Sequence, residues 1–408
     1  MMKIIWIIII FSTIINKVNC GWIEKDLGLS VFTVLSDVTF SDENNGWIVG
    51  SSGIILHTSD GGDTWSEQIS NTKEVLLKVF FLNNDKGWIA SSDKILKTTD
   101  GGDTWTSCQT DVCYGINSIY MLDDNNGWAV GEGGWIYKTT DGYNWNKIQG
   151  SINLDLNDLD FATKDKGIIV GSFGDLQYII NGEYQHSMSI ISSDDRYQSI
   201  FFVDSLYGWI AGYNKNLAST SPDRCILLRS SDAGENWDYI SYAPSSSFRD
   251  IFFIDREEGL IVAADGTIFY TNDGGITLSK QFFVPNVFWN GICFTTDKIG
   301  WAVGTLGTLA YYDESIGIDD YTNNSFKTCI YPNPVEDNVS INISIEQKCI
   351  VKIEIYDSFG RLINEIYKNS LSAGEIFINS NLSYLNNGIY FIKLSTGDKF
   401  ELIKFIKI

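Results

Sequence analysis

Carboxylates recur in one kind of turn along this chain, and they are the first side chains that could do chemistry. The turn reads Thr58-Ser59-Asp60-Gly61-Gly62-Asp63-Thr64-Trp65 where it first appears. Aspartates repeated in this way could ligate calcium or transfer protons. In a turn, however, aspartate accepts hydrogen bonds from local amides, glycine supplies a positive φ, and tryptophan can cover the core. We therefore interpret the repeated turn residues as structural. They are Asp60, Gly62, Trp65, Asp100, Gly102, Trp105, Asp141, Trp145, Asp232, Gly234, Trp237, Asp273 and Gly275.

Metal ions, cofactors and nucleophilic triads have little support in the residue types present. The histidines are His57 and His186, and the chain has no C-x-x-C pair. Thiolate or imidazole metal sites and Ser-His-Asp triads need more of these residues at suitable spacings. We predict no metal, no cofactor and no catalytic residue.

A glycine that is usually followed by tryptophan recurs along the chain and indicates the repeated strands that must hold these turns. We call it the marker glycine. The marker occurs at Gly46, Gly87, Gly127, Gly167, Gly208, Gly259 and Gly300, in steps of 41, 40, 40, 41, 51 and 41 residues. Repeats of this length are typical of four-stranded propeller blades, and seven of them can close a ring. The fold class predicted is all-β: a seven-bladed β-propeller followed by a small C-terminal β-sandwich.

When the repeats are aligned on the marker glycine, two positions before it are apolar in every repeat. These two apolar columns predict the innermost strand of each blade. Six residues before it stand Phe40, Phe81, Met121, Phe161, Phe202, Phe253 and Phe294, and another apolar residue lies two positions earlier. Such a spacing puts both columns on one side of a strand. The last repeat has no outer strand after it, whereas residues 21–25 resemble the outer strand at 64–68. We expect the N-terminal segment to supply that strand and so close the ring.

Composition and the N-terminus indicate an exported protein. The chain has 408 residues and a net charge of −22, which argues against nucleic acid or an anionic membrane as a partner. Lys3 is followed by an apolar run to Ile15, and small or medium residues precede Gly21. Residues 1–20 are therefore predicted to be a signal peptide cleaved near Cys20. After cleavage, no segment is long and apolar enough to span a bilayer.

The repeated turn resembles the Asp-box of the BNR repeat, Ser/Thr-x-Asp-x-Gly-x-Thr-Trp. Together with the Gly-Trp strands, it makes residues 21–316 similar to the photosystem II assembly and stability factor family, a seven-bladed propeller. That resemblance is specific for the fold. Photosynthetic members of the family assist the assembly of a reaction-centre subunit. Sialidases, sortilin-type receptors and xyloglucan-active glycosidases share the box.

The C-terminal region differs in character from the repeats. A polar linker at 317–328 precedes short alternating strands, as in a small β-sandwich. The sequence Tyr331-Pro332-Asn333-Pro334, the turn Asp357-x-x-Gly360-Arg361 and the strand starting at Gly388 resemble the type A sorting domain of the type IX secretion system over residues 329–408. The resemblance implies a partner in that secretion machinery and a secreted or cell-surface location. An ordinary adhesive β-sandwich is the alternative.

The remaining candidates are cysteines that could form disulfides and loop residues that could bind a ligand. Cys108 with Cys113, and Cys329 with Cys349, could form disulfides, which export permits. In BNR propellers the ligand face is built by the loops that enter the inner strands and the loops that join the second and third strands. Here the corresponding candidates are Asp195, Arg196, Tyr197, Gln198, Arg224, Arg249, Asp250, Trp289 and Asn290.

We call these residues the mouth residues. Together they could hold a glycan or a peptide, although the charged ones could also be solvated charges at the rim of the propeller. We predict a non-catalytic binding or scaffold propeller with an unknown protein or glycan ligand. The alternative is a sialidase- or xyloglucanase-like hydrolase. It would use two carboxylates, for which Asp158, Asp195 and Asp250 are the candidates.

Overall fold

A computed structural model describes residues 21–110, 115–148, 154–185, 194–214, 224–241, 247–296, 299–313, 326–331, 335, 337–345, 348–357, 361–396 and 399–407. The chain divides into two compact units, which are described separately here. The predicted leader, Cys113, and residues 317–325 of the predicted linker lie outside these residues, as do the side chains of Arg224 and Cys329. Within the described ranges, no helix is long and apolar enough to cross a membrane.

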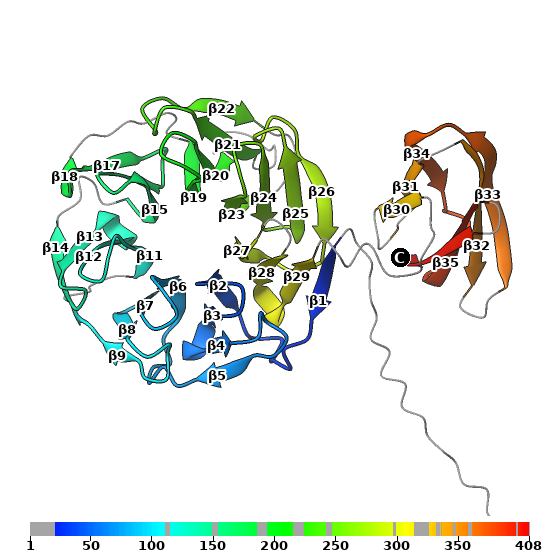
Figure 1. Ribbon diagram of the computed structural model, residues 1–408. Coiled ribbons are helices and arrows are strands. Elements are labelled where there is room, and N and C mark those ends of the chain that lie inside the picture. Colours follow the sequence, from blue (N-terminus) through cyan, green and yellow to red (C-terminus); the bar gives the residue numbers. More distant parts are fainter. Residues whose placement is uncertain are drawn as a thin grey trace, which may run out of the picture. The chain divides into compact units, whose positions relative to one another are not determined.

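Around the axis of the first unit, the described strands between residues 22 and 313 form seven sheets (Figure 1). The inner strands are β2 (Leu35–Phe40), β6 (Leu76–Phe81), β11 (Ile116–Met121), β15 (Leu156–Thr163), β19 (Asp195–Phe202), β23 (Phe248–Phe253) and β27 (Trp289–Phe294). The second strands are β3 (Gly46–Gly50), β7 (Gly87–Ser91), β12 (Asn126–Gly131), β16 (Lys166–Gly171), β20 (Gly208–Asn214), β24 (Glu258–Ala263) and β28 (Ile299–Gly304). The predicted all-β propeller class is confirmed.

The third and outer strands complete the sheets. The third strands are β4 (Ile55–Thr58), β8 (Ile95–Thr98), β13 (Ile136–Thr140), β17 (Leu176–Ile180), β21 (Arg224–Ser230), β25 (Thr267–Asn272) and β29 (Leu309–Asp313). The outer strands are β5 (Ser66–Gln68), β9 (Thr106–Ser107), β14 (Asn144–Ile148), β18 (Glu183–Gln185), β22 (Asp238–Ser241) and β26 (Ser279–Phe283), with β10 (Gln109–Thr110) parallel to β14. Short 3₁₀ turns follow three second strands: η1 (Ser51–Gly53), η2 (Glu132–Gly134) and η3 (Thr305–Gly307).

The N-terminal strand closes the ring, as the sequence predicts. Strand β1 (Trp22–Lys25) is the outer neighbour of β29 in the sheet that also contains β28 and β27. In the same region Asn290 Nδ2 of β27 donates a hydrogen bond to the Leu35 carbonyl of β2, at 2.8 Å. The last sheet is therefore joined to the first one and also completed by the start of the chain.

The marker glycines are needed because a side chain lies on each of them, a phenylalanine ring at six positions and Met121 at Gly127. A Cβ atom on Gly46 would stand 2.5 Å from the ring of Phe40, which pairs with it across β2 and β3. The equivalent Phe81 of the next sheet stacks on Trp47, with ring centroids 3.4 Å apart. A larger residue at the marker would push the phenylalanine into the tryptophan of the preceding sheet, so the glycine and tryptophan act as one packing unit.

The second unit is a β-sandwich. One sheet has the order β30 (Phe326–Tyr331), β31 (Asn338–Ile345), β34 (Gly374–Asn381). The other has the order β33 (Leu362–Leu371), β32 (Cys349–Asp357), β35 (Gly388–Thr396), β36 (Lys399–Lys407). Alternate residues of both sheets, such as Ile341 and Ile353, share one buried core, as expected for facing sheets. The Asp357 carboxylate accepts hydrogen bonds from the Arg361 backbone amide at 2.9 Å and from the Arg361 guanidinium at 2.6 Å, which links the end of β32 to the residue before β33.

Candidate functional site

The repeated aspartates hold turns together. Asp60 accepts hydrogen bonds from the Thr64 amide at 2.9 Å, the Thr64 hydroxyl at 2.6 Å and the Thr58 hydroxyl at 2.7 Å. These bonds, chiefly those from Thr64, lower the pKa of Asp60 to about 2. Asp100 has the same partners, in Thr98 and Thr104. Each carboxylate is thus an ionised acceptor that is already occupied within its own turn.

The glycines of the same turns join neighbouring sheets. Trp47 Nε1 of the first sheet donates to the Gly101 carbonyl of the second at 3.1 Å, and Trp209 Nε1 donates to the Gly274 carbonyl at 2.9 Å. At the seam between the last and first sheets, Lys25 Nζ of β1 bonds the Gly62 carbonyl at 2.9 Å. These contacts support the interpretation of the turns as structural.

The predicted mouth residues separate into buried and accessible groups. Tyr197 and Trp289 are fully buried, and the Trp289 indole donates to the Gly266 carbonyl at 2.9 Å. Asp195 is also buried and accepts hydrogen bonds from Asn214 at 2.6 Å and Tyr197 at 3.4 Å. Because these three side chains are buried inside the propeller, they do not form part of a surface that could bind a ligand.

A bulge explains why the sequence pattern misplaces Tyr197. The pairing of β19 with β20 shifts between Tyr197 and Ser199, so one extra residue is inserted into the inner strand. Strict alternation would put Tyr197 on the same side as Ser199, whereas the bulge turns it into the core with Ile200. The same shift occurs between Trp289 and Gly291.

The accessible mouth residues lie at the N-terminal ends of neighbouring inner strands. Arg249 is exposed and donates to Gln198 Oε1 of the adjacent sheet at 3.2 Å. The Arg196 guanidinium carbon lies 3.5 Å from the centre of the Phe173 ring, a cation–π arrangement. The structure therefore brings Arg249 and Gln198 together, and it brings Arg196 to an aromatic residue that the sequence prediction missed.

The sequence prediction also missed a set of polar contacts that join most neighbouring inner strands. These residues, which we call the middle ring, stand nine positions before each marker glycine: Asp37, Lys78, Ser118, Asp158, Ser199, Asp250 and Gly291. They could have been found by aligning the repeats at this position, where three aspartates occur together with lysine and serine side chains that can donate hydrogen bonds. Only Asp250 was among the predicted ligand residues, and Asp158 was a candidate of the hydrolase alternative.

Each acid of the middle ring bonds the next inner strand. Asp37 accepts from the Val79 amide at 2.9 Å, Asp158 from the Ile200 amide at 2.9 Å, and Asp250 from the Ile292 amide at 3.0 Å. A backbone N–H at the edge of each of these strands therefore finds its hydrogen-bond acceptor in a side chain of the preceding inner strand.

Side chains of the middle ring supply the remaining donors. Ser118 bonds Asp158 at 2.6 Å, Ser199 bonds Asp250 at 2.7 Å, and Lys78 Nζ lies 3.4 Å from Asp37. Burial raises the pKa of Asp37 to about 6. Burial alone would lower the pKa of Lys78, but the three carboxylates raise it above its usual range. Lys78 is therefore the shared counter-ion of the middle ring.

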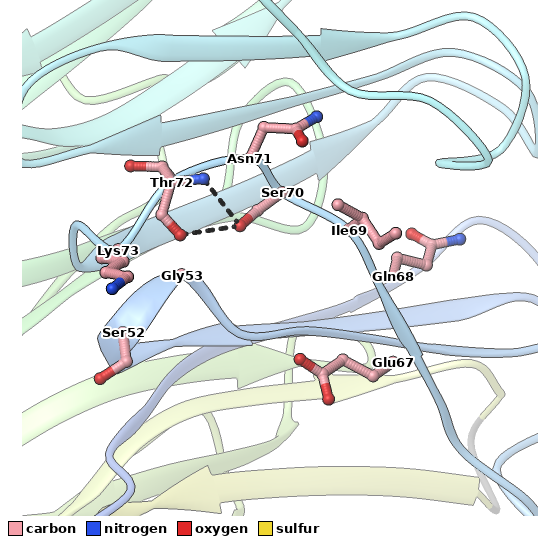
Figure 2. A pocket seen from close by; sticks show the side chains of 9 residues that line it. All are labelled: Ser52, Gly53, Glu67, Gln68, Ile69, Ser70, Asn71, Thr72 and Lys73. Atoms are coloured by element: carbon pink, nitrogen blue, oxygen red, sulfur yellow. Dashed lines mark hydrogen bonds between the residues drawn. The ribbon is translucent and has the colours of Figure 1, made fainter.

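A shallow hollow of about 450 Å³ lies beside the outer strand of the first sheet (Figure 2). Its walls include Gly53 and the segment from Glu67 to Lys73. Within it the Ser70 hydroxyl bonds the Thr72 carbonyl at 3.3 Å. The residues around this hollow do not include any of the predicted mouth residues.

The cysteines do not form the predicted disulfides. Cys108 and Cys349, the described member of each predicted pair, are free thiols, and so is Cys293. Cys108 is buried beside Trp88 and Trp145, and burial raises the pKa of its thiol to about 12. A thiol in such apolar surroundings behaves as a small core residue.

Comparisons with known proteins agree with this two-part organisation. The family described as photosynthesis system II assembly factor YCF48 matches residues 16–145, and the secretion system C-terminal sorting domain matches residues 329–408. The chloroplastic photosystem II stability/assembly factor HCF136 of Cyanidioschyzon merolae is 49% identical over 43 residues. The photosystem II assembly lipoprotein Ycf48 of a Synechocystis strain is 35% identical over 51 residues. The chain spans only 10% and 15% of the lengths of these two relatives.

Solved structures show the same fold at low identity. A structure of YCF48 bound to D1 peptide has a TM-score of 0.58 and 21% identity, covering 72% of this chain and 97% of that one. PorZ, a surface component of the type IX secretion system of Porphyromonas gingivalis, has a TM-score of 0.51 and 12% identity, covering 90% of this chain and 58% of that one. The protein thus combines a β-propeller similar to YCF48 with a secretion-system sorting domain, which indicates a protein that is secreted or associated with the cell surface.

Proposed function

We propose that this protein is a non-catalytic binding scaffold, exported by the type IX secretion system through residues 329–408. Its ligand is an extended peptide segment or a glycan of a partner molecule, held at the N-terminal ends of the inner strands. The observation that carries the proposal is the use of the acids around the axis as connectors between sheets. A scaffold needs such a rigid ring, whereas a hydrolase needs acids that can reach a substrate.

The carboxylates available to a hydrolase argue for the same conclusion. Asp158 and Asp250 are each 7% exposed, and Asp195 is fully buried. Each already accepts hydrogen bonds from its surroundings, and the shortest bond of each is 2.6 or 2.7 Å long. A glycosidase needs one carboxylate to protonate the leaving group and another to attack or to activate water. Both functions would require breaking contacts that hold the ring.

The accessible residues suit ligand binding. Arg249 has a guanidinium on the surface, Gln198 provides an amide beside it, and Arg196 stacks on Phe173. Guanidinium groups bind carboxylates and carbonyl oxygens, and aromatic rings pack on sugars or apolar side chains. The neighbour whose structure contains a bound D1 peptide supports a peptide as one candidate ligand.

Arg249→Ala tests the binding surface. A peptide and glycan array probed with the leader-free chain should show retained ligands, and Arg249→Ala should weaken the strongest of them at least tenfold. Arg256→Ala is the matched control, because Arg256 is also an exposed arginine but pairs with Asp204 in a turn at the other end of the inner strand. Equal binding by all three proteins would contradict the proposed surface.

Removal of residues 329–408 tests the export route. In a host with a type IX system, the shortened protein should accumulate in the periplasm in a folded, protease-resistant form, while the full chain reaches the cell surface or medium. Periplasmic fractionation with immunoblotting measures this directly. Normal surface export of the shortened chain would refute the sorting role.

A further inference from the structure

A second ring of side chains lies two residues beyond the middle ring, toward the C-terminal ends of the inner strands. We call it the aromatic ring, and its members are Thr39, Phe80, Tyr120, Asp160, Phe201, Phe252 and Cys293. The period of a strand places these residues on the same side as the middle ring. Phe80 contacts Tyr120 of the next sheet with ring centroids 5.2 Å apart, and Phe201 contacts Phe252 at 4.9 Å. Four aromatic side chains therefore flank a single acid.

Asp160 is the acid in the middle of this aromatic sequence. It comes after Tyr120 and before Phe201 around the ring, and it accepts hydrogen bonds from the Phe161 and Phe202 amides, both at 2.7 Å. Within the described part of the chain, no basic side chain forms an ion pair with Asp160, whereas Asp37 has Lys78. Burial raises the pKa of Asp160 to about 7. A partly desolvated carboxylate without a counter-ion favours the approach of a cation.

The surroundings at this end of the inner strands are also acidic. The turns that lead to the second strands expose several carboxylates: Asp42, Glu43, Asp85, Asp123, Asp255 and Glu257. Lys86 pairs with Asp124 and Arg256 with Asp204, so basic residues offset only part of this charge. In a chain of net charge −22, the summed field attracts cations toward the aromatic ring.

We propose that the aromatic ring binds an alkylammonium group, with the Asp160 carboxylate accepting its N–H donors and the faces of Tyr120 and Phe201 contacting its methylenes. Aromatic faces carry partial negative charge and attract ammonium ions. A lysine side chain of a partner protein and a free amine share this chemistry. The site is distinct from the proposed mouth, because Arg249 and Gln198 lie toward the opposite ends of the inner strands.

Ionisation of Asp160 makes this binding dependent on pH. The charged and titratable groups that act on Asp160 are Asp158 and Lys78 of the middle ring and Tyr120 of the adjacent strand. Lys78 stays charged, and the pKa of Tyr120 is raised to about 12 by burial, so both keep their charge state between pH 6 and 8. Affinity should therefore increase from pH 6 to pH 8 as Asp160 loses its proton.

Titration calorimetry with n-butylammonium and with a lysine-containing tripeptide tests the proposal, using the full leader-free chain at pH 8. Both cations should bind, while n-butanol, a neutral molecule of similar shape, should not. A tripeptide that binds more than tenfold tighter than n-butylammonium would identify a protein partner as the source of the ammonium group. Equal affinities would identify a free amine.

Asp160→Asn should raise the dissociation constant at least tenfold, and Phe201→Leu should raise it severalfold by removing an aromatic face. Asp238→Asn is the matched control, because it removes an exposed carboxylate of the outer strand β22, and the affinity of this variant should stay within twofold. Melting temperatures of all variants establish that they fold. Absence of binding by the unmodified chain, or unchanged affinity in folded Asp160→Asn and Phe201→Leu, would overturn the proposal.

Discussion

Single residues in this propeller have roles that their types alone do not reveal. An aspartate in the repeated turn and an aspartate of the middle ring are both acids, but their surroundings shift their pKa values in opposite directions. Hydrogen bonds from Thr64 lower the pKa of Asp60, whereas burial raises that of Asp37. The marker glycines likewise act through contact with a side chain, a phenylalanine ring at all but Gly127, rather than through a special backbone conformation.

Gly259→Ala tests the role of a marker glycine. Its added Cβ would lie 2.5 Å from the Phe253 ring, which stacks on Trp209 at 3.6 Å. Overpacking of this kind should lower the free energy of unfolding by about 1–3 kcal/mol in a urea titration. Gly115→Ala is the control, since its nearest neighbour is the Glu132 side chain at 3.4 Å. Similar losses in both variants would contradict the packing argument.

The raised pKa of Asp37 predicts how stability depends on pH. The folded protein favours protonated Asp37, so its stabilising contribution is complete below pH 3.8 and is lost as pH rises through about 6. Asp60 acts in the opposite sense, because its contribution is present above pH 3.8 and is lost as pH falls through about 2. Melting temperatures should therefore decrease from pH 4 to pH 7.

Asp37→Asn tests how much of that decrease is due to Asp37, because burial also raises the pKa values of Asp160 and Asp250. The variant should show a flatter profile between pH 4 and 7, since it lacks the titrating carboxyl. Asp238→Asn, which changes an exposed carboxylate of β22, should keep the slope of the unmodified protein. A slope that is identical in Asp37→Asn and the unmodified protein would assign the pH dependence to other groups.

At the level of elements, sheets are joined to one another in three ways. Inner-strand acids bond the amides of the next inner strand, second-strand tryptophans bond the glycine turns, and phenylalanines stack on those tryptophans. Strand β1 completes the last sheet by pairing with β29. Closure through the N-terminal strand covers a sheet edge that would otherwise be open.

Trp22→Ala tests the contribution of this closing strand. Trp22 of β1 is fully buried, and truncating a buried tryptophan should cost about 3–5 kcal/mol of unfolding free energy. Glu67→Ala in the outer strand β5 is the control, because that side chain is exposed. A loss below 1 kcal/mol on urea titration of Trp22→Ala would mean that β1 contributes little to the ring.

For the whole molecule, periodic patterns predicted more than individual loop residues did. The spacing of the marker glycines and the apolar columns predicted the propeller and its closure, because they report local packing that recurs in every sheet. The bulge before Ser199 and the bonds between successive inner strands depend on the register of strands that are distant in sequence. For that reason Tyr197 and Trp289 were wrongly expected at a ligand surface, and the middle ring was overlooked.

The most direct test of the account is a combined binding and turnover screen of the leader-free chain with polysaccharides, sialosides and peptides. The account predicts ligands that are retained and recovered without cleavage, even after long incubation. Product formation by the unmodified chain that is abolished in Asp158→Asn or Asp250→Asn, at an unchanged melting temperature, would contradict it. That result would mean that these acids act on a substrate instead of joining the inner strands.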